Sequence, residues 1–111
     1  MGGILTLVPI SGSFVNAEYE WDEAKAAANL AKHGVSFVAA ARALDDPHKI
    51  EWVDQRFDYG EERIQSLCMY RGVVLFVVTV TRGDNVCRII SARKATRREE
   101  ERYFESGSLL P

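Results

Sequence analysis

The spacing of hydrophobic and polar residues divides the chain into a helical first part and a strand-rich second part. Residues 23–33 carry Leu30 and alanines 24, 27, 28 and 31 on one side of a predicted helix, which we expect to face the core. From residue 48 onward, β-branched and apolar residues come in short runs separated by turn residues. The pattern predicts a strand at 19–21, helices at 23–33 and 37–44, strands at 48–53, 63–70, 73–81 and 86–92, and a helix at 96–105.

Capping and turn residues support these boundaries. Asp22, Ser36 and Thr96 each precede a predicted helix and have side chains that can accept its first free amide protons. Gly34 suits the left-handed position after the first helix, and Pro47 ends the second. Turn sequences join the strands at 58–60 (DYG), 71–72 (RG) and 82–85 (RGDN).

The order of elements predicts an α+β domain with a short N-terminal strand, two helices, an antiparallel meander of about four strands and a C-terminal helix. The run VVLFVVTV at 73–80 is apolar on both faces, which indicates a central strand. We expect the helices to gather on one side of the sheet. The domain should span residues 18–105, with residues 1–17 as an extension outside it and 106–111 as a tail.

Composition favours an ordinary globular protein. The 111 residues are 47% hydrophobic and 27% charged, and no apolar run reaches the roughly 18 residues that cross a membrane. Cys68 and Cys87 stand alone among apolar neighbours, so we expect small buried side chains in a reducing compartment. The sequence therefore predicts a cytoplasmic protein. It contains no cluster of carboxylates at metal-ligand spacing, so we expect no metal or other cofactor.

Charge is distributed unevenly along the chain. Residues 1–62 hold five basic and eleven acidic residues, a net charge of −6, whereas residues 63–111 hold nine basic and five acidic, a net charge of +4. A locally basic surface attracts polyanions even when the whole chain carries a net charge of −2. Residues 63–111 are thus the part of the chain that we expect to bind a polyanion.

Arginines mark the ends of several predicted strands. Simple alternation places Arg88, Ile90, Ala92 and Lys94 on one face of the last strand, with Cys87, Ile89, Ser91 and Arg93 on the other. Arg63 and Arg82 lie at the ends of neighbouring strands. Guanidiniums from different strands would form a rigid phosphate site, although they could equally protect strand edges or pair with acidic residues.

Four segments in order, YEWDEAKAAANLAKHGVSF (19–37), DDP (45–47), DYGEER (58–63) and RIISARKATRREEERYFE (88–105), resemble the BrnT family of bacterial toxins. The resemblance implies a RelE-like fold and a ribonuclease that cleaves RNA and inhibits translation. It also implies a BrnA-like antitoxin whose ribbon-helix-helix part binds operator DNA, so that the toxin reaches DNA only through the complex.

RNA cleavage without a metal requires proton transfer and stabilisation of negative charge. For the charge we expect Arg63, Arg82 and Arg93. For proton transfer we expect His33 or Glu62, with Lys32 a further candidate. Further RNA contacts are predicted at Lys25, Asn29, Lys32, Arg88 and Lys94.

Simpler interpretations remain for several of these residues. His33 could only stabilise the end of its helix, and Lys25 and Asn29 could be a solvated helix face. Trp21 and Trp52 could stack on bases, although Trp21 fits the core better. Two other functions also stay open: a non-catalytic subunit of a DNA-binding repressor complex, and a domain that binds a small phosphorylated ligand.

Overall fold

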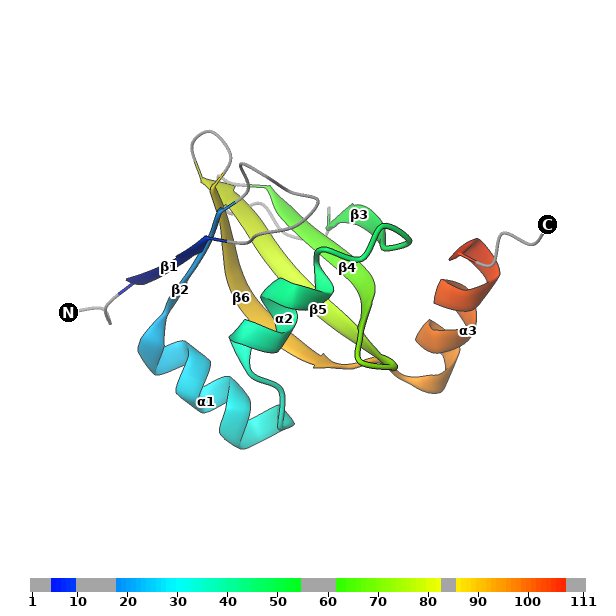
Figure 1. Ribbon diagram of the computed structural model, residues 1–111, viewed down its shortest axis with the longest axis horizontal. Helices are drawn as coiled ribbons and strands as arrows, with labels where there is room; N and C mark the ends of the chain where they lie inside the picture. Colours follow the sequence, from blue (N-terminus) through cyan, green and yellow to red (C-terminus); the bar gives the residue numbers. More distant parts are fainter. Residues whose placement is uncertain (1–4, 10–17, 55–61, 83–85, 108–111) are drawn as a thin grey trace.

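The computed structural model describes residues 5–9, 18–54, 62–82 and 86–107 (Figure 1). The predicted order of elements is confirmed, with most boundaries within two residues of expectation. The elements are β1 (Leu5–Pro9), β2 (Glu18–Asp22), α1 (Glu23–His33), α2 (Phe37–Ala43), β3 (Ile50–Asp54), β4 (Arg63–Tyr70), β5 (Val73–Arg82), β6 (Val86–Lys94) and α3 (Arg97–Gly107).

The strands form one six-stranded sheet in the order β1-β2-β6-β5-β4-β3. All neighbours are antiparallel except β2 and β6, which run parallel and bring the start of the domain beside its last strand. The turn between β4 and β5 consists of Arg71 and Gly72, both at positive φ, as predicted. The predicted turns at 58–60 and 82–85 lie largely outside the described residues.

The predicted helix caps are present. The Asp22 carboxylate accepts the amide protons of Ala24 and Lys25 at 2.8 and 3.2 Å, and the Ser36 hydroxyl accepts that of Ala39 at 3.0 Å. Gly34 closes α1 in the left-handed conformation, with φ of 71°. These local signals fix where each helix begins and ends.

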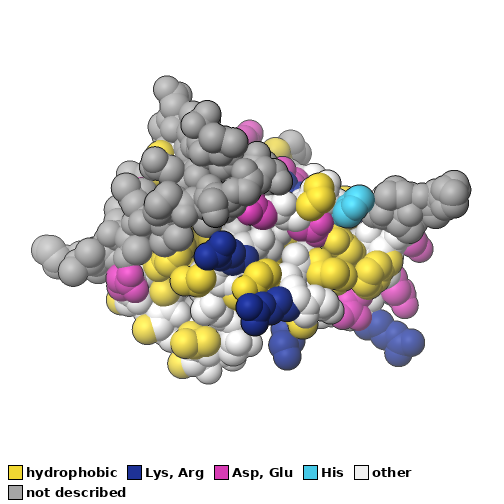
Figure 2. All heavy atoms as spheres, viewed as in Figure 1, with side chains coloured by type: hydrophobic (Ala, Val, Ile, Leu, Met, Phe, Trp, Pro, Cys, Tyr) yellow, Lys and Arg dark blue, Asp and Glu magenta, His cyan; other side chains and the backbone are white. Residues whose placement is uncertain are grey.

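The predicted inward face of α1 is wrong. Leu30 is 51% exposed, and alanines 24, 27, 28 and 31 also lie outside the core. Apolar side chains are visible around this helix on the face shown in Figure 2. The side that packs against β6 instead carries Ala26 and Asn29.

Asn29 holds α1 against the sheet. Its amide nitrogen donates to the carbonyls of Val35 and Ala92 at 3.0 and 2.8 Å, and its amide oxygen accepts from the Ala92 amide at 3.2 Å. The side chain is 8% exposed and makes these bonds to backbone groups 6 and 63 residues away. Because buried polar groups are normally hydrogen-bonded, these bonds explain how an asparagine can occupy a buried position on the inward side of α1.

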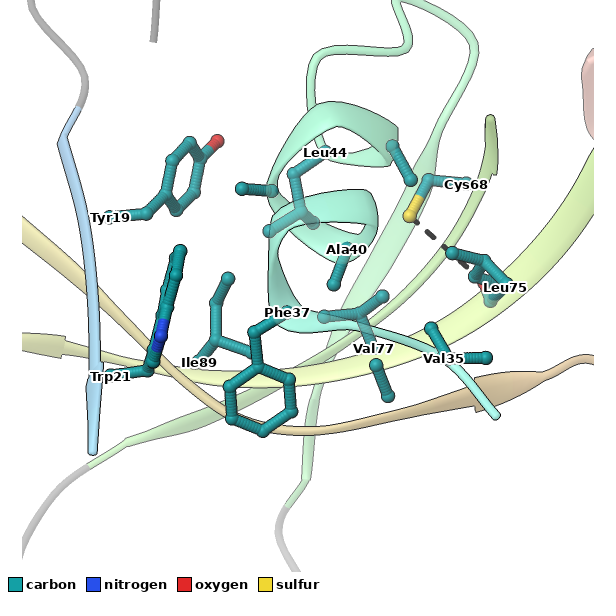
Figure 3. Packing of buried hydrophobic residues seen from close by; sticks show 13 residues of the cluster. Tyr19, Trp21, Val35, Phe37, Ala40, Leu44, Cys68, Leu75, Val77 and Ile89 are labelled. Atoms are coloured by element: carbon teal, nitrogen blue, oxygen red, sulfur yellow. Dashed lines mark hydrogen bonds between the residues drawn. The ribbon is translucent and has the colours of Figure 1, made fainter. Parts of the chain in front are cut away.

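The larger core lies between the sheet and helices α1 and α2 (Figure 3). Trp21 and Phe37 meet edge to face with their ring centroids 6.1 Å apart, and Trp21 is 4% exposed, so its interpretation as a core residue is confirmed. Cys68 is fully buried in this core and Cys87 packs against it; both are free thiols. Burial raises the pKa of the Cys68 thiol to about 12.

The third helix lies on the opposite face of the sheet, so the expectation that all helices share one side is wrong. Leu67 and Val74 pack with Tyr103 of α3, whereas their chain neighbours Cys68 and Leu75 pack in the larger core. Because side chains alternate along a strand, the two clusters lie on opposite faces. The Tyr103 hydroxyl donates to the Asp46 carboxylate, which also accepts from the Met69 amide at 2.9 Å and so ties α3 to the segment after α2.

A β-bulge in β6 reverses the predicted side-chain pattern of this strand. Ile89 pairs with Thr79 and Ser91 pairs with Val78, which leaves Ile90 as an extra residue. Ile89 and Ala92 therefore both face the larger core, while Ser91 and Arg93 face the other side. Simple alternation had placed Ala92 with Arg88 and Ile89 with Arg93, and the bulge makes that assignment wrong.

The first strand adds to the sheet a segment that was expected to lie outside the domain. Leu5–Pro9 pairs antiparallel with Glu18–Asp22 as an edge strand. Residues 10–17 lie outside the described part, so the boundary at residue 18 stays a prediction, as does the RelE-like label. Within the described residues, no helix is long and apolar enough to cross a membrane.

Candidate functional site

A cavity of about 650 Å³ lies on the α3 side of the sheet. Its floor comes from β3, β4, β5 and β6, and one wall comes from the first turns of α3. The lining residues are Lys25, Trp52, Asp54, Arg63, Gln65, Phe76, Val78, Ile90, Ser91, Arg93, Glu99 and Arg102. Four cationic side chains against two carboxylates give this cavity a positive balance within an acidic protein.

Arg93 is held in the cavity by three kinds of contact. Its Nη1 and Nη2 atoms donate to the two Glu99 carboxylate oxygens at 2.8 and 3.0 Å. Its guanidinium carbon lies 4.2 Å from the Phe76 ring centroid, and Nη1 also donates to the Lys94 carbonyl at 3.2 Å. The Glu99 contact raises the pKa of Arg93, which therefore stays charged, and Arg93 in turn lowers the pKa of Glu99.

The position of Glu99 follows from the start of α3. The Glu99 amide donates to the Thr96 hydroxyl at 3.2 Å, and a Glu99 carboxylate oxygen accepts from the Thr96 amide at 2.8 Å. This reciprocal pair is a capping box, in which the third residue of a helix turns back onto the cap. The helix start thus fixes the carboxylate that orients Arg93.

Aromatic side chains form part of the cavity surface. Trp52 and Phe76 lie with their ring centroids 6.2 Å apart and their planes inclined at 58°. The guanidinium carbon of Arg102 lies 4.4 Å from the Trp52 ring centroid. Cations beside aromatic faces suit a ligand that carries both phosphates and bases.

Of the residues predicted for the site, the structure brings together Lys25, Arg63 and Arg93. Trp52, predicted as a base-stacking candidate, joins them. These residues come from α1, β3, β4 and β6, so tertiary structure alone assembles the group.

Other predicted residues do not line this cavity. His33 is half-buried at the end of α1, and Lys32, Glu62 and Lys94 are exposed elsewhere, while Arg88 lies half-buried in β6. Arg82 ends β5, and its side chain lies outside the described part of the structure. Catalytic or RNA-binding roles for these residues stay predictions.

Asn29 requires a correction. The sequence predicts an RNA contact on an exposed helix face, but the side chain is buried and its amide is bonded to the backbone of Val35 and Ala92. Binding RNA would break these bonds, so we assign Asn29 a structural role.

The site also contains residues that were not predicted from the sequence: Asp54, Gln65, Phe76, Glu99 and Arg102. For Glu99 a signal was present, because Thr96 and Glu99 have the spacing of a capping box. Arg97 and Glu101 form an ion pair at 3.8 Å, on the exposed side of α3. Asp54, Gln65 and Phe76 depend on strand register and Arg102 on the packing of α3 against the sheet, neither of which a short motif specifies.

A second hollow between α1 and α2 has a different character. Its lining is mostly apolar, with Glu23 as its one ionisable side chain among the described residues: Trp21, Glu23, Ala26, Ala27, Leu30, Ser36, Phe37 and Val38. It lies on the face seen in Figure 2, where apolar side chains gather around α1. This hollow is unsuited to a polyanion, so the α3 side is the candidate site.

Among the described residues, no group of three or more His, Cys, Asp or Glu side chains is arranged to hold a metal ion. The side chains of Lys25, Arg63, Arg93 and Arg102 supply positive charge to the cavity.

Comparison with known proteins identifies a matching family and a similar solved structure. The family described as "Ribonuclease toxin, BrnT, of type II toxin-antitoxin system" matches residues 21–99. The crystal structure of the Brucella abortus ribonuclease toxin BrnT is similar, with 25% sequence identity and a TM-score of 0.52, over 69% of this chain and 94% of that chain. Among curated proteins no match was found.

Proposed function

The chain belongs to the BrnT family of ribonuclease toxins of type II toxin–antitoxin systems, and we propose on this basis that the cavity is its site of RNA cleavage. One observation carries the proposal: Lys25, Arg63, Arg93 and Arg102 reach the same cavity from four separate elements. Cations fixed on separate elements are organised before the substrate arrives, which is what stabilisation of a transition state requires.

We propose a metal-independent endoribonuclease mechanism. The ribose 2′-hydroxyl attacks the adjacent phosphorus, the bond to the 5′-oxygen breaks, and the products are a 2′,3′-cyclic phosphate and a 5′-hydroxyl. Negative charge develops on the phosphate oxygens, where the guanidiniums of Arg63 and Arg93 can donate in pairs. The 2′-hydroxyl proton passes to water, and Lys25 gives a proton to the leaving oxygen.

The biological outcome of this activity would be an arrest of translation in the cytoplasm, where RNA is available. Expression from a tightly controlled promoter should stop growth and degrade RNA. Cells that keep growing with intact RNA, despite folded toxin, would contradict this part of the proposal.

The direct test is cleavage of a defined RNA by purified protein in the presence of a chelator. We expect cyclic-phosphate ends and no cleavage when the 2′-hydroxyl at the scissile position is replaced by hydrogen. Arg93→Ala should abolish most of the activity, while Arg97→Ala, which removes an exposed arginine of α3, should not. Cleavage that requires an added divalent ion, or that survives in Arg93→Ala, would contradict the mechanism.

For the antitoxin partner that a type II system implies, we propose a BrnA-like protein that binds along α3 and covers the cavity. The outer side of α3 exposes Phe104, at 52%, beside Glu100, Glu101 and Glu105. An apolar residue within an acidic surface suits an amphipathic basic segment, and such a segment would add charge complementarity. The ribbon-helix-helix part of the antitoxin would hold operator DNA.

Phe104→Glu tests this surface. We expect the variant to remain toxic but to escape neutralisation when the antitoxin is co-expressed. The matched change Val38→Glu, on the α2 side, should leave neutralisation intact. Full neutralisation of Phe104→Glu would exclude the α3 surface as the main contact.

A further inference from the structure

Arg93 uses only part of its guanidinium in its contacts with the protein. Its Nη1 atom donates to Glu99 Oε1 at 2.8 Å and to the Lys94 carbonyl at 3.2 Å, and its Nη2 atom donates to Glu99 Oε2 at 3.0 Å. A guanidinium has five N–H groups. Within the described residues, these bonds leave the N–H of Nε and one N–H of Nη2 without a protein acceptor.

The two remaining N–H groups lie on one edge of the guanidinium. Glu99 takes the edge formed by Nη1 and Nη2, so the second N–H of Nη2 points the same way as the N–H of Nε. This edge is a planar fork of the kind with which arginine binds two oxygens of one phosphate. The Arg93 side chain lines the cavity and is 34% exposed, so a phosphate in the cavity can reach this fork.

Two opposite roles of Glu99 are compatible with its ion pair to Arg93. As a competitor, the carboxylate would occupy the place of a phosphate group, and RNA would have to displace it. As a positioning residue, it would hold one edge of the guanidinium while a phosphate binds the other edge. The two roles predict opposite effects on RNA cleavage when the carboxylate is removed.

The anchoring of Glu99 favours the positioning role. Its carboxylate accepts the Thr96 amide proton at 2.8 Å in the capping box that begins α3. Tyr103 lies four residues further on the same side of the helix and donates its hydroxyl to Asp46. Displacement of Glu99 would therefore open the start of a helix that is held at a second point, so we expect Glu99 to stay in place when RNA binds.

We propose that the Nε–Nη2 edge of Arg93 is the subsite for the scissile phosphate and that Glu99 is its positioning residue; this rests on the proposed cleavage of RNA in the same cavity. The ligand is a phosphodiester, whose two non-bridging oxygens accept from Nε and Nη2. Phe76 also confines the guanidinium, because its ring centroid lies 4.2 Å from the guanidinium carbon. An arginine oriented before RNA arrives needs no reorganisation as negative charge develops on the phosphate.

Glu99→Gln tests the positioning role. Glutamine also suits this position of a capping box, but it loses the charge and one of the two acceptor oxygens. We expect the single-turnover rate of RNA cleavage to fall about 10–10²-fold, the scale of a small misplacement of a catalytic group. Binding of an uncleavable 2′-O-methyl RNA should stay within about fivefold of wild type, because one partly exposed carboxylate contributes little to attraction or repulsion.

The matched control is Glu100→Gln, which removes an exposed carboxylate from the same turn of α3 and should keep both the rate and the affinity. The Arg93→Ala background separates positioning from a structural role. Without a guanidinium to position, Glu99→Gln should change the remaining rate by less than about twofold. An equal loss from Glu99→Gln in the wild-type and Arg93→Ala backgrounds would show a structural role and overturn the proposal.

The phosphate subsite and the ribonuclease mechanism can fail separately. If wild type cleaves RNA and Glu99→Gln cleaves it equally fast, Glu99 is not a positioning residue and only the present proposal fails. Faster cleavage and tighter binding of RNA by Glu99→Gln would identify Glu99 as a competitor, with the same consequence. If wild type does not cleave RNA, the ribonuclease mechanism fails and the role of Glu99 fails with it.

Discussion

The carboxylate of Glu99 and the guanidinium of Arg93 meet in a two-point ion pair, with N–O distances of 2.8 and 3.0 Å. The pair joins the end of β6 to the first turn of α3. It also places the guanidinium 4.2 Å from the Phe76 ring centroid, so the arginine is confined on two sides. A long, flexible cationic side chain is thereby given a defined position in the cavity.

Removal of a cavity arginine should slow RNA cleavage far more than it affects folding. We expect Arg93→Ala and Arg63→Ala each to lower the single-turnover rate by about 10²–10³-fold, the usual effect of losing one donor to a developing oxyanion. Arg93→Lys should recover only part of the rate, because an ammonium lacks the planar fork. Rates within tenfold of wild type for both alanine variants would place the chemistry elsewhere.

The ion pair also predicts a pH dependence of stability. Arg93 lowers the pKa of Glu99 below its ordinary value of 4.5, so folding favours the ionised carboxylate. This contribution is complete above the ordinary pKa and is lost as the pH falls through the lower value of the folded state. The free energy of unfolding of wild type should therefore exceed that of Glu99→Gln by about 1 kcal/mol at pH 7. This difference should vanish at low pH.

Urea unfolding at several pH values measures this difference. Glu100→Gln, at an exposed position in the same turn, is the control and should show little difference at any pH. A constant gap between wild type and Glu99→Gln from pH 7 to pH 3 would show that ionisation of Glu99 is not the cause.

Loss of Asn29 should destabilise the fold. Asn29→Ala leaves two carbonyls and one amide without their partner in a buried place, and we expect a loss of about 2–3 kcal/mol in the free energy of unfolding. Lys32→Ala, on the exposed side of the same helix, should change it by less than about 0.5 kcal/mol. Equal stability of the two variants in urea would argue against a structural role for Asn29.

A variant of His33 distinguishes between a mechanism based on the cavity residues and the sequence-based prediction that His33 is a catalytic acid or base. Since His33 does not line the cavity, His33→Ala should keep cleavage within about twofold of wild type, whereas a catalytic acid or base contributes about 10²–10⁴-fold. Rates measured from pH 5 to pH 9 should show the same profile for both proteins. A loss of two orders of magnitude would restore His33 as a catalytic residue.

Local signals predicted the elements well, because each depends on residues close in the chain. Asp22, Ser36 and Gly34 act within one helical turn, and their caps are present as expected. Which face of each element is buried was harder to predict. Ile90 is an extra residue in β6, and the polar Asn29 belongs to the inward side of α1 because it bonds a strand 63 residues away.

The candidate site was predictable only in part for the same reason. Arg63 and Arg93 were found because arginine is the preferred phosphate ligand and both lie at strand ends. Asp54 and Gln65 became members through the pairing of β3 with β4, which depends on tertiary structure. Residue type alone suggested His33, but the fold places it away from the cavity lining.

The parallel pairing of β2 with β6 has a consequence for how the protein is made. The cavity takes residues from Lys25 to Arg102, and the sheet is complete only when the last strand lies beside the second. Contacts between such distant segments form late and slow the folding of a small domain. A nascent or truncated chain that stops before β6 therefore lacks Arg93 and Arg102, and we expect the proposed activity only once synthesis of the chain is almost finished.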